Sequence, residues 1–187
     1  MLIVLEAMVR WLAPVLSFTA EEIWRFMPGQ REESIFLSQW SRLPVAADKQ
    51  AHPIDWARII ALRTAVAREL EKLRVLGTIG APLDAEVDLY CGPALQSMLS
   101  KLGDELRFVL ITSEARVVAA DVKPAEAIAA AESADNDVWI VVRPATAAKC
   151  VRCWHKRSDI GGHMDHPELC DRCAVNVSGA GEVRRFA

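Results

Sequence analysis

Four of the chain's five cysteines form two Cys-x-x-Cys pairs, and this spacing constrains the fold of residues 149–173 most strongly. Cys150 and Cys153 form the first pair, Cys170 and Cys173 form the second, and sixteen residues lie between the pairs. A gap of two residues lets one tight turn direct both sulfur atoms to the same ion, and two such turns complete a tetrahedron of thiolates. The spacing therefore predicts one Zn²⁺ ion in a structural site, because four protein ligands leave no coordination position for a substrate.

Other uses of these residues fit the sequence less well. A redox-active Cys-x-x-Cys accounts for one pair but not for two pairs at zinc spacing. The chain has five cysteines, an odd number, and four of them form such pairs, which favours metal in a reducing cytoplasm over secreted disulfides. His155, His163 and His166 are possible substitute ligands, but beside four thiolates we expect them to face solvent or RNA. Cys91 lies in an alternating apolar pattern and is predicted to be a buried strand residue.

The first sixteen residues are nearly all apolar, which raises the question of a signal peptide or membrane span. Glu6 and Arg10 interrupt the run, and no small-residue cleavage site follows it. No stretch of the chain reaches the length of a transmembrane helix. The pattern predicts a core helix over residues 2–12 and no membrane partner.

Two further helices are predicted before residue 80. Thr19 and Glu22 have the spacing of a capping box, so a helix should begin near Ala20 and end before Pro28. Residues 34–37 are predicted to be extended, and 41–53 a polar linker. A long helix is predicted over 54–76, with its stop at Gly77. Its apolar stripe recurs at helical spacing and comprises Ile59, Leu62, Val66, Leu70, Leu73 and Leu76. Its basic residues are offset by acidic ones, which favours a solvated face over an RNA surface.

The pattern changes to a period of two after residue 82. Residues 87–91 alternate apolar and polar side chains and predict a strand, residues 93–102 predict a helix, and 107–112, 116–120 and 138–142 predict further strands. Residues 124–134 are either a surface helix or a loop. The fold class expected is α+β, with a helical part over 1–80, a small α+β part over 81–143 and a zinc-binding module over 144–187.

Three stretches resemble one family of enzymes. "RWLAPVLSFTAEEIW", from Arg10 to Trp24, resembles the anticodon-binding helical domain of class I aminoacyl-tRNA synthetases for aliphatic amino acids. "ARELEKLRVLGTIGAPLDAEVDLY", from Ala67 to Tyr90, resembles the segment that follows it in the isoleucine enzymes. "KCVRCWHKRSDIG" and "HPELCDRCAVNVSGAGEVRRFA" resemble the C-terminal zinc module of bacterial isoleucyl-tRNA synthetases. The first stretch also suits the valine and leucine enzymes, whereas the four-cysteine module favours isoleucine.

The resemblance implies a tRNA-binding role without catalysis. The family joins isoleucine to tRNA(Ile) using ATP, but its signatures His-Ile-Gly-His and Lys-Met-Ser-Lys-Ser do not occur here, and the editing domain is missing. We therefore expect a C-terminal fragment that positions the anticodon end of tRNA(Ile), with ATP and isoleucine bound only by the missing catalytic domain. A helical bundle truncated at its start would leave Met1–Leu16 uncovered, which predicts self-association.

The basic end of the chain is where RNA contacts are expected. Residues 143–187 carry eight basic and five acidic side chains, although the whole chain has a net charge of −3. The candidate RNA-binding residues are Arg152, Trp154, Lys156, Arg157, Arg184 and Arg185. Cations hold phosphates, and the Trp154 ring either stacks on an unpaired base or packs under the zinc knuckle.

Two other classes of protein fit parts of the sequence. The zinc finger of formamidopyrimidine-type DNA glycosylases has similar cysteine spacing, but those enzymes need a catalytic N-terminal proline and a β-sandwich. A free-standing zinc protein that binds RNA explains the cysteines but not the stretch from Arg10 to Trp24.

Overall fold

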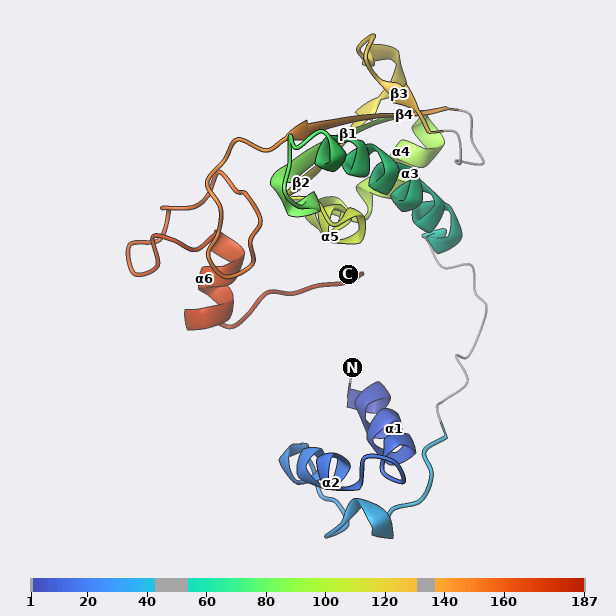
Figure 1. Cartoon of the computed structure of the whole chain (residues 1–187), viewed down its shortest axis with the longest axis vertical. Helices are drawn as coiled ribbons and strands as arrows, with labels where there is room; N and C mark the ends of the chain where they lie inside the picture. The colour runs from blue at the N-terminus through green and yellow to red at the C-terminus, as the bar shows by residue number, and fades with distance from the viewer. Residues whose placement is uncertain (1, 43–53, 131–136, 187) are drawn as a thin grey trace. The chain divides into compact units, whose positions relative to one another are not determined.

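The computed structural model describes residues 2–42, 54–130 and 137–186, and the chain divides into two compact units, Met1–Gln50 and Ala51–Ala187 (Figure 1). Most of the predicted linker over 41–53 lies outside the described residues. The described parts contain α-helices and one four-stranded sheet, which confirms the α+β class. None of the described helices combines the length and the apolar character needed to cross a membrane.

The described part of the first unit, residues 2–42, contains two helices and a short turn. Helix α1 (Leu2–Leu12) has the predicted bounds, and it is followed by α2 (Ser17–Phe26) and the 3₁₀ turn η1 (Ile35–Leu37). The indole nitrogen of Trp24 donates to the Glu32 carbonyl at 2.9 Å, so the buried ring also joins α2 to the following loop. The core of the unit comprises Val9, Ala13, Ala20, Trp24, Met27 and Ile35.

Two predictions for this unit were wrong in detail. Helix α2 begins at Ser17 rather than near Ala20, and no side chain caps its start. The Glu21 carboxylate instead accepts hydrogen bonds from the Ser34 hydroxyl and the Ile35 amide. Ser34 then caps η1, so the predicted extended segment is a helical turn.

The second unit is built on a mixed sheet with the strand order β2-β1-β4-β3. Strand β1 (Ala85–Cys91) lies parallel to β2 (Glu114–Ala119) and antiparallel to β4 (Val138–Pro144), which also pairs with β3 (Ile128–Ala129). Helices α3 (Trp56–Val75), α4 (Pro93–Ser100) and α5 (Leu106–Leu110) pack with the sheet around one apolar core (Figure 1). The 3₁₀ turns η2 (Pro82–Asp84), η3 (Gly103–Glu105) and η4 (Ala120–Val122) connect these elements, and α6 (Asp171–Ser178) lies near the end of the chain.

Helix α3 follows the predicted stripe over most of its length. Asp55 caps its start, accepting from the Arg58 amide, and the stripe is buried from Ile59 to Leu70. Leu76 is 75 % exposed, so the buried stripe stops short of the predicted end. Gly77 has a φ of +71° and ends the helix as expected. Because the stripe packs in the core of the sheet, α3 belongs to the second compact unit, whereas the predicted partition placed it in a helical part over 1–80.

Two further predictions, for residues 87–91 and 107–112, differ from the structure of the second unit. Strand β1 is central, so Asp88 and Tyr90 are buried as well as its apolar residues, whereas Glu86 is half-buried. Asp88 pairs with Arg116 and Arg143 from the neighbouring strands. The predicted strand over 107–112 is instead α5, because Leu106 and Leu110, one helical turn apart, both enter the core. Residues 124–130 contain the short strand β3, and 131–134 lie outside the described residues.

Candidate metal centre and RNA-binding surface

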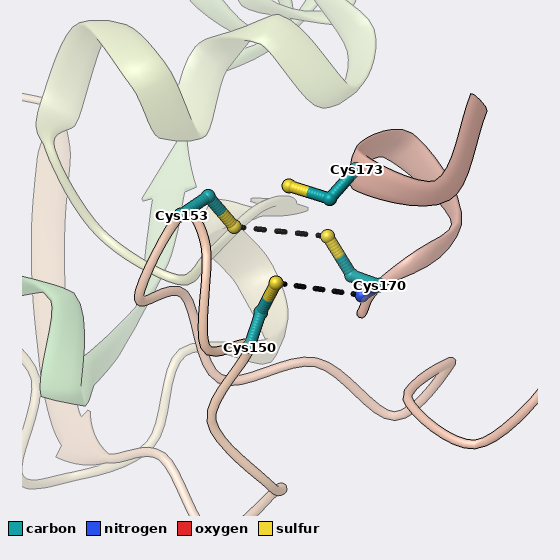
Figure 2. Close-up of side chains that lie close together, drawn as sticks. All are labelled: Cys150, Cys153, Cys170 and Cys173. Carbon is teal, nitrogen blue, oxygen red and sulfur yellow. Dashed lines mark hydrogen bonds between the residues drawn. The ribbon is translucent and has the colours of Figure 1, made fainter. Parts of the chain in front are cut away.

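The first cysteine pair lies in a tight turn closed by backbone hydrogen bonds. The Cys150 amide donates to the His155 carbonyl, and the Trp154 amide donates to the Cys150 carbonyl, both at 2.9 Å. Lys149 and Lys156 form a β-bridge across the base of the turn. This closure directs the sulfur atoms of Cys150 and Cys153 toward the second pair (Figure 2).

The second cysteine pair lies at the start of α6. Cys170 is the residue before the helix, and Cys173 lies in its first turn. The Cys170 amide donates to the Cys150 sulfur at 3.5 Å, which joins the two turns. Leu169 and Ala174 are buried against the cysteines and form the small core of this segment.

The four sulfur atoms form a cluster of the size that zinc requires. All of them lie within 4.8 Å of one another, and the Cys153 and Cys170 sulfurs are 3.7 Å apart (Figure 2). Zinc–sulfur bonds of about 2.3 Å in a tetrahedron place neighbouring sulfurs about 3.8 Å apart. The predicted set of Cys150, Cys153, Cys170 and Cys173 is therefore brought together in a geometry that fits a tetrahedral metal ion.

The electrostatics of the cluster also favour a cation. Burial alone would raise the pKa of the Cys150 thiol, but amides of Cys153, Cys170 and Arg152 donate to its sulfur and lower that pKa to about 6. Burial, together with the adjacent Cys153 sulfur, raises the pKa of Cys170 to about 12 and also raises the pKa of Cys173. Four thiolates this close repel one another, so full ionisation requires a positive ion among them.

One of the three histidines is not placed as expected. His155 is only 7 % exposed, so the prediction that it faces solvent or RNA is wrong. Its ring packs edge-on against Phe108, with centroids 5.6 Å apart, and burial lowers its pKa to about 4. His163 pairs with Asp171, and His166 hydrogen-bonds the Ser178 hydroxyl.

Four of the six predicted RNA-contact residues are exposed: Arg152, Trp154, Arg184 and Arg185. Trp154 is 63 % exposed and has a φ of +67°, and the ammonium of Lys149 lies 6.0 Å from its ring centroid. The ring therefore does not fill the small core of the segment. Arg185 is exposed, and its backbone amide donates to the Glu105 carboxylate at 2.8 Å.

Four of the predicted contacts, including the exposed Arg152 and Arg184, have intramolecular partners for their side chains. Arg152 donates to the Cys173 sulfur at 3.5 Å, and Lys156 donates to the Ala145 carbonyl at 3.0 Å. Arg157 pairs with Glu114 at 2.5 Å. Arg184 pairs with Glu182 at 3.0 Å, and its guanidinium lies over the Phe108 ring.

Sequence reasoning missed the residue that connects this segment to the sheet. Ser113 is fully buried; its hydroxyl donates to the Leu83 carbonyl at 2.5 Å and accepts from the Lys156 amide at 2.6 Å. Ser113 and Lys156 are 43 residues apart in the chain, so no local pattern could have indicated this contact.

Comparison with known proteins assigns both ends of the chain to families. Residues 1–89 match the family described as the anticodon-binding domain of tRNA ligase. Residues 148–175 match the zinc finger found in FPG and IleRS. The second match includes all four clustered cysteines, and the first favours a tRNA ligase over a DNA glycosylase or a free-standing zinc protein.

Similarity to individual proteins extends over nearly the whole chain. The chain is 54 % identical over 184 residues to the isoleucine–tRNA ligase of Nitrosococcus oceani and 53 % identical over 186 residues to that of Methylococcus capsulatus. Over nearly all of its length the chain therefore matches a segment of isoleucine–tRNA ligases. These alignments include 97 % of the chain but only 19 % of each relative, so the chain spans about a fifth of the length of the curated relatives it matches. The isoleucine–tRNA ligase of Pseudomonas aeruginosa is 48 % identical with the same coverage.

Proposed function

We propose that this segment holds the anticodon end of tRNA(Ile) for a cytoplasmic isoleucine–tRNA ligase. The relatives carry that name, and the match over residues 1–89 is to an anticodon-binding domain. Other parts of the enzyme bind ATP and isoleucine and attach the amino acid to the tRNA. The segment alone forms no isoleucyl adenylate, because it lacks the nucleotide-binding signatures of the class I enzymes.

The observation that carries the RNA-binding part of the proposal is the position of Trp154. A non-glycine residue in the left-handed region costs of order 1 kcal/mol or more, and exposure of an indole gives no burial energy in return. Trp154 has both properties, directly after the first cysteine pair. Proteins bind unpaired bases by stacking them on exposed aromatic rings, and the bases of an anticodon loop are unpaired.

The surroundings of Trp154 supply positive charge for the RNA backbone. Lys149 lies beside the ring, and Arg185 has an exposed guanidinium elsewhere on the same unit. Arg152, Lys156, Arg157 and Arg184 are held by protein groups, so in this proposal they contribute through the longer-range potential. Lys149 also has a protein partner, since its ammonium pairs with Asp84 at 3.5 Å, so in this proposal the direct phosphate contact is made by Arg185.

One zinc ion in the cysteine cluster would hold this surface in shape. Cys150, Cys153, Cys170 and Cys173 would be its ligands, and it would act as a structural cross-link without an open coordination position. Trp154 follows a ligand directly, so the turn that carries the ring is closed by the same bonds that close the site.

Binding of a tRNA(Ile) transcript, measured by fluorescence anisotropy at several KCl concentrations, tests the proposal. Trp154→Ala should weaken binding by roughly 5- to 150-fold, since stacking on one base is worth about 1–3 kcal/mol. Trp154→Phe should retain most of the affinity. Met164→Ala, which removes another exposed apolar side chain of the same segment, is the matched control and should have no effect.

Charge reversal supplies a second, independent readout. Arg184→Glu combined with Arg185→Glu should weaken binding and reduce the slope of affinity against salt, with the zinc content unchanged. Equal tRNA binding by wild type, Trp154→Ala and the charge-reversed chain would overturn the proposal. Isoleucine-dependent ATP–pyrophosphate exchange by the chain alone would contradict the assignment of catalysis to other parts of the enzyme.

A further inference from the structure

Each cysteine pair contains an arginine directly before its second cysteine. The sequences are Cys150-Val-Arg-Cys153 and Cys170-Asp-Arg-Cys173, so Arg152 and Arg172 occupy equivalent places in the two turns. The structure brings both guanidinium groups to one sulfur atom. Arg152 Nη1 is 3.5 Å from the Cys173 sulfur, and Arg172 Nη2 is 4.0 Å from it.

The orientation of Arg172 is set by contacts on three sides. Its Nη1 donates to the Glu182 carboxylate at 3.0 Å, and its guanidinium lies 5.1 Å from the Phe108 ring centroid on α5. Glu182 is itself fixed by Asn176 of α6, whose side-chain amide donates to the carboxylate and whose oxygen accepts from the Glu182 backbone amide. The side chain of Arg172 is thereby held with its second nitrogen toward the metal cluster.

The negative charge of a zinc–thiolate centre explains why two guanidinium groups lie beside it. Four thiolates around one divalent cation carry a net charge of −2, and such a charge in a partly buried site is unfavourable without compensation. Two guanidinium groups supply the two missing positive charges. Hydrogen bonds from charged donors to an anionic acceptor are also stronger than those from neutral donors.

We propose that Arg152 and Arg172 form a cationic clamp that neutralises the metal–thiolate centre and slows the loss of its zinc. The clamp rests on the proposed zinc site and assigns Arg152 to the metal rather than to RNA. Arg172 is a positioning residue held by Glu182, so the tail segment that follows α6 contributes to metal retention. Both arginines act on the Cys173 sulfur, because it is the acceptor that they share.

Transfer of zinc from the loaded chain to a chromogenic chelator tests the clamp. Arg152→Ala and Arg172→Ala should each lower zinc affinity by roughly 10- to 100-fold, the usual effect of removing a partner of a metal ligand, and should accelerate transfer accordingly. Arg152→Lys should lie between wild type and Arg152→Ala, because it keeps the charge but loses the forked geometry. Glu182→Gln should accelerate transfer less than Arg172→Ala, since it weakens only the support of Arg172.

Arg63→Ala is the matched control, because it removes the same charge from an exposed position on α3 of the same unit. Its rate of zinc transfer should equal that of the wild type. The absorption bands of the Co²⁺-substituted variants report whether the tetrahedral thiolate set is intact. Arg152 has an exposed side chain, so Arg152→Ala keeps the test valid if Arg172→Ala fails to fold.

The outcomes separate the clamp from the function on which it rests. Zinc transfer at the wild-type rate from Arg152→Ala and Glu182→Gln overturns the clamp and leaves the zinc site standing. Wild-type protein that takes up no zinc overturns both. Arg152→Ala that loses tRNA affinity without faster zinc transfer shows that Arg152 contacts phosphate, which also overturns the clamp.

Discussion

Replacing Ser113 with alanine should loosen the attachment of the metal-binding segment to the sheet. The fully buried hydroxyl serves two backbone groups, donating to the Leu83 carbonyl and accepting from the Lys156 amide. A buried polar group left without a partner costs about 1–3 kcal/mol. Because Lys156 is only half-buried, the cost of leaving its amide without a partner lies at the lower end of that range. Loss of both hydrogen bonds, from the Lys156 amide and to the Leu83 carbonyl, should therefore lower the free energy of unfolding by about 2–4 kcal/mol.

Residue-resolved hydrogen exchange measures this effect at the contact itself. In Ser113→Ala the Lys156 amide should exchange much faster, and the free energy of unfolding from the slowest amides of β1 should fall by the amount above. Ser100→Ala, at the exposed end of α4, is the control and should change stability by no more than about 0.5 kcal/mol. If Ser113→Ala changes stability as little as the control and the Lys156 amide stays protected, the reasoning is refuted.

Three other properties can be checked on the same chain. Cys170→Ser should abolish zinc binding by elemental analysis and disorder residues 148–175, while α3 and the sheet keep their exchange protection; retained zinc would contradict the four-thiolate site. Cys91 should resist iodoacetamide at pH 8, since burial raises its pKa to about 11 from a model-compound value of 9.0. The contribution of that raised pKa to stability is present below about pH 9 and is lost as the pH rises through 11. Leu2, Val4 and Leu5 are each at least 40 % exposed on α1, so the chain should sediment as concentration-dependent oligomers that replacement of all three by serine disperses. A wild-type monomer at all concentrations would count against this.

The chemistry of the metal centre could be predicted from the sequence because its determinants are local. A gap of two residues limits where two sulfur atoms can point, and two such gaps at zinc spacing leave few alternatives. The long helix α3 could also be predicted from the sequence, since its apolar residues recur with the helical period from Ile59 to Leu70. The similarity to isoleucine–tRNA ligases could be predicted because the motifs that carry it are contiguous in the chain.

Local patterns failed where burial or distant partners decided the outcome. The run over 107–112 is rich in strand-forming residues, but most of it belongs to helix α5, because the helical conformation lets Leu106 and Leu110 both pack into the core. Strand β1 alternates in sequence but is buried at every position except the half-buried Glu86, since it lies between β2 and β4. Long-range packing therefore outweighed local propensity in both elements.

The amino-acid sequence by itself determined which residues could hold a metal and that the basic residues gather near the cysteines. Only the tertiary structure decided which of those basic residues are available to RNA. Arg152 and Arg157 have the same charge and lie five positions apart, yet Arg152 contacts the Cys173 sulfur and Arg157 pairs with Glu114 on β2. Trp154, between them, stays exposed. The physical reason is that charge and residue type are properties of the chain, whereas the partner that satisfies a charge comes from whichever segment the fold places beside it.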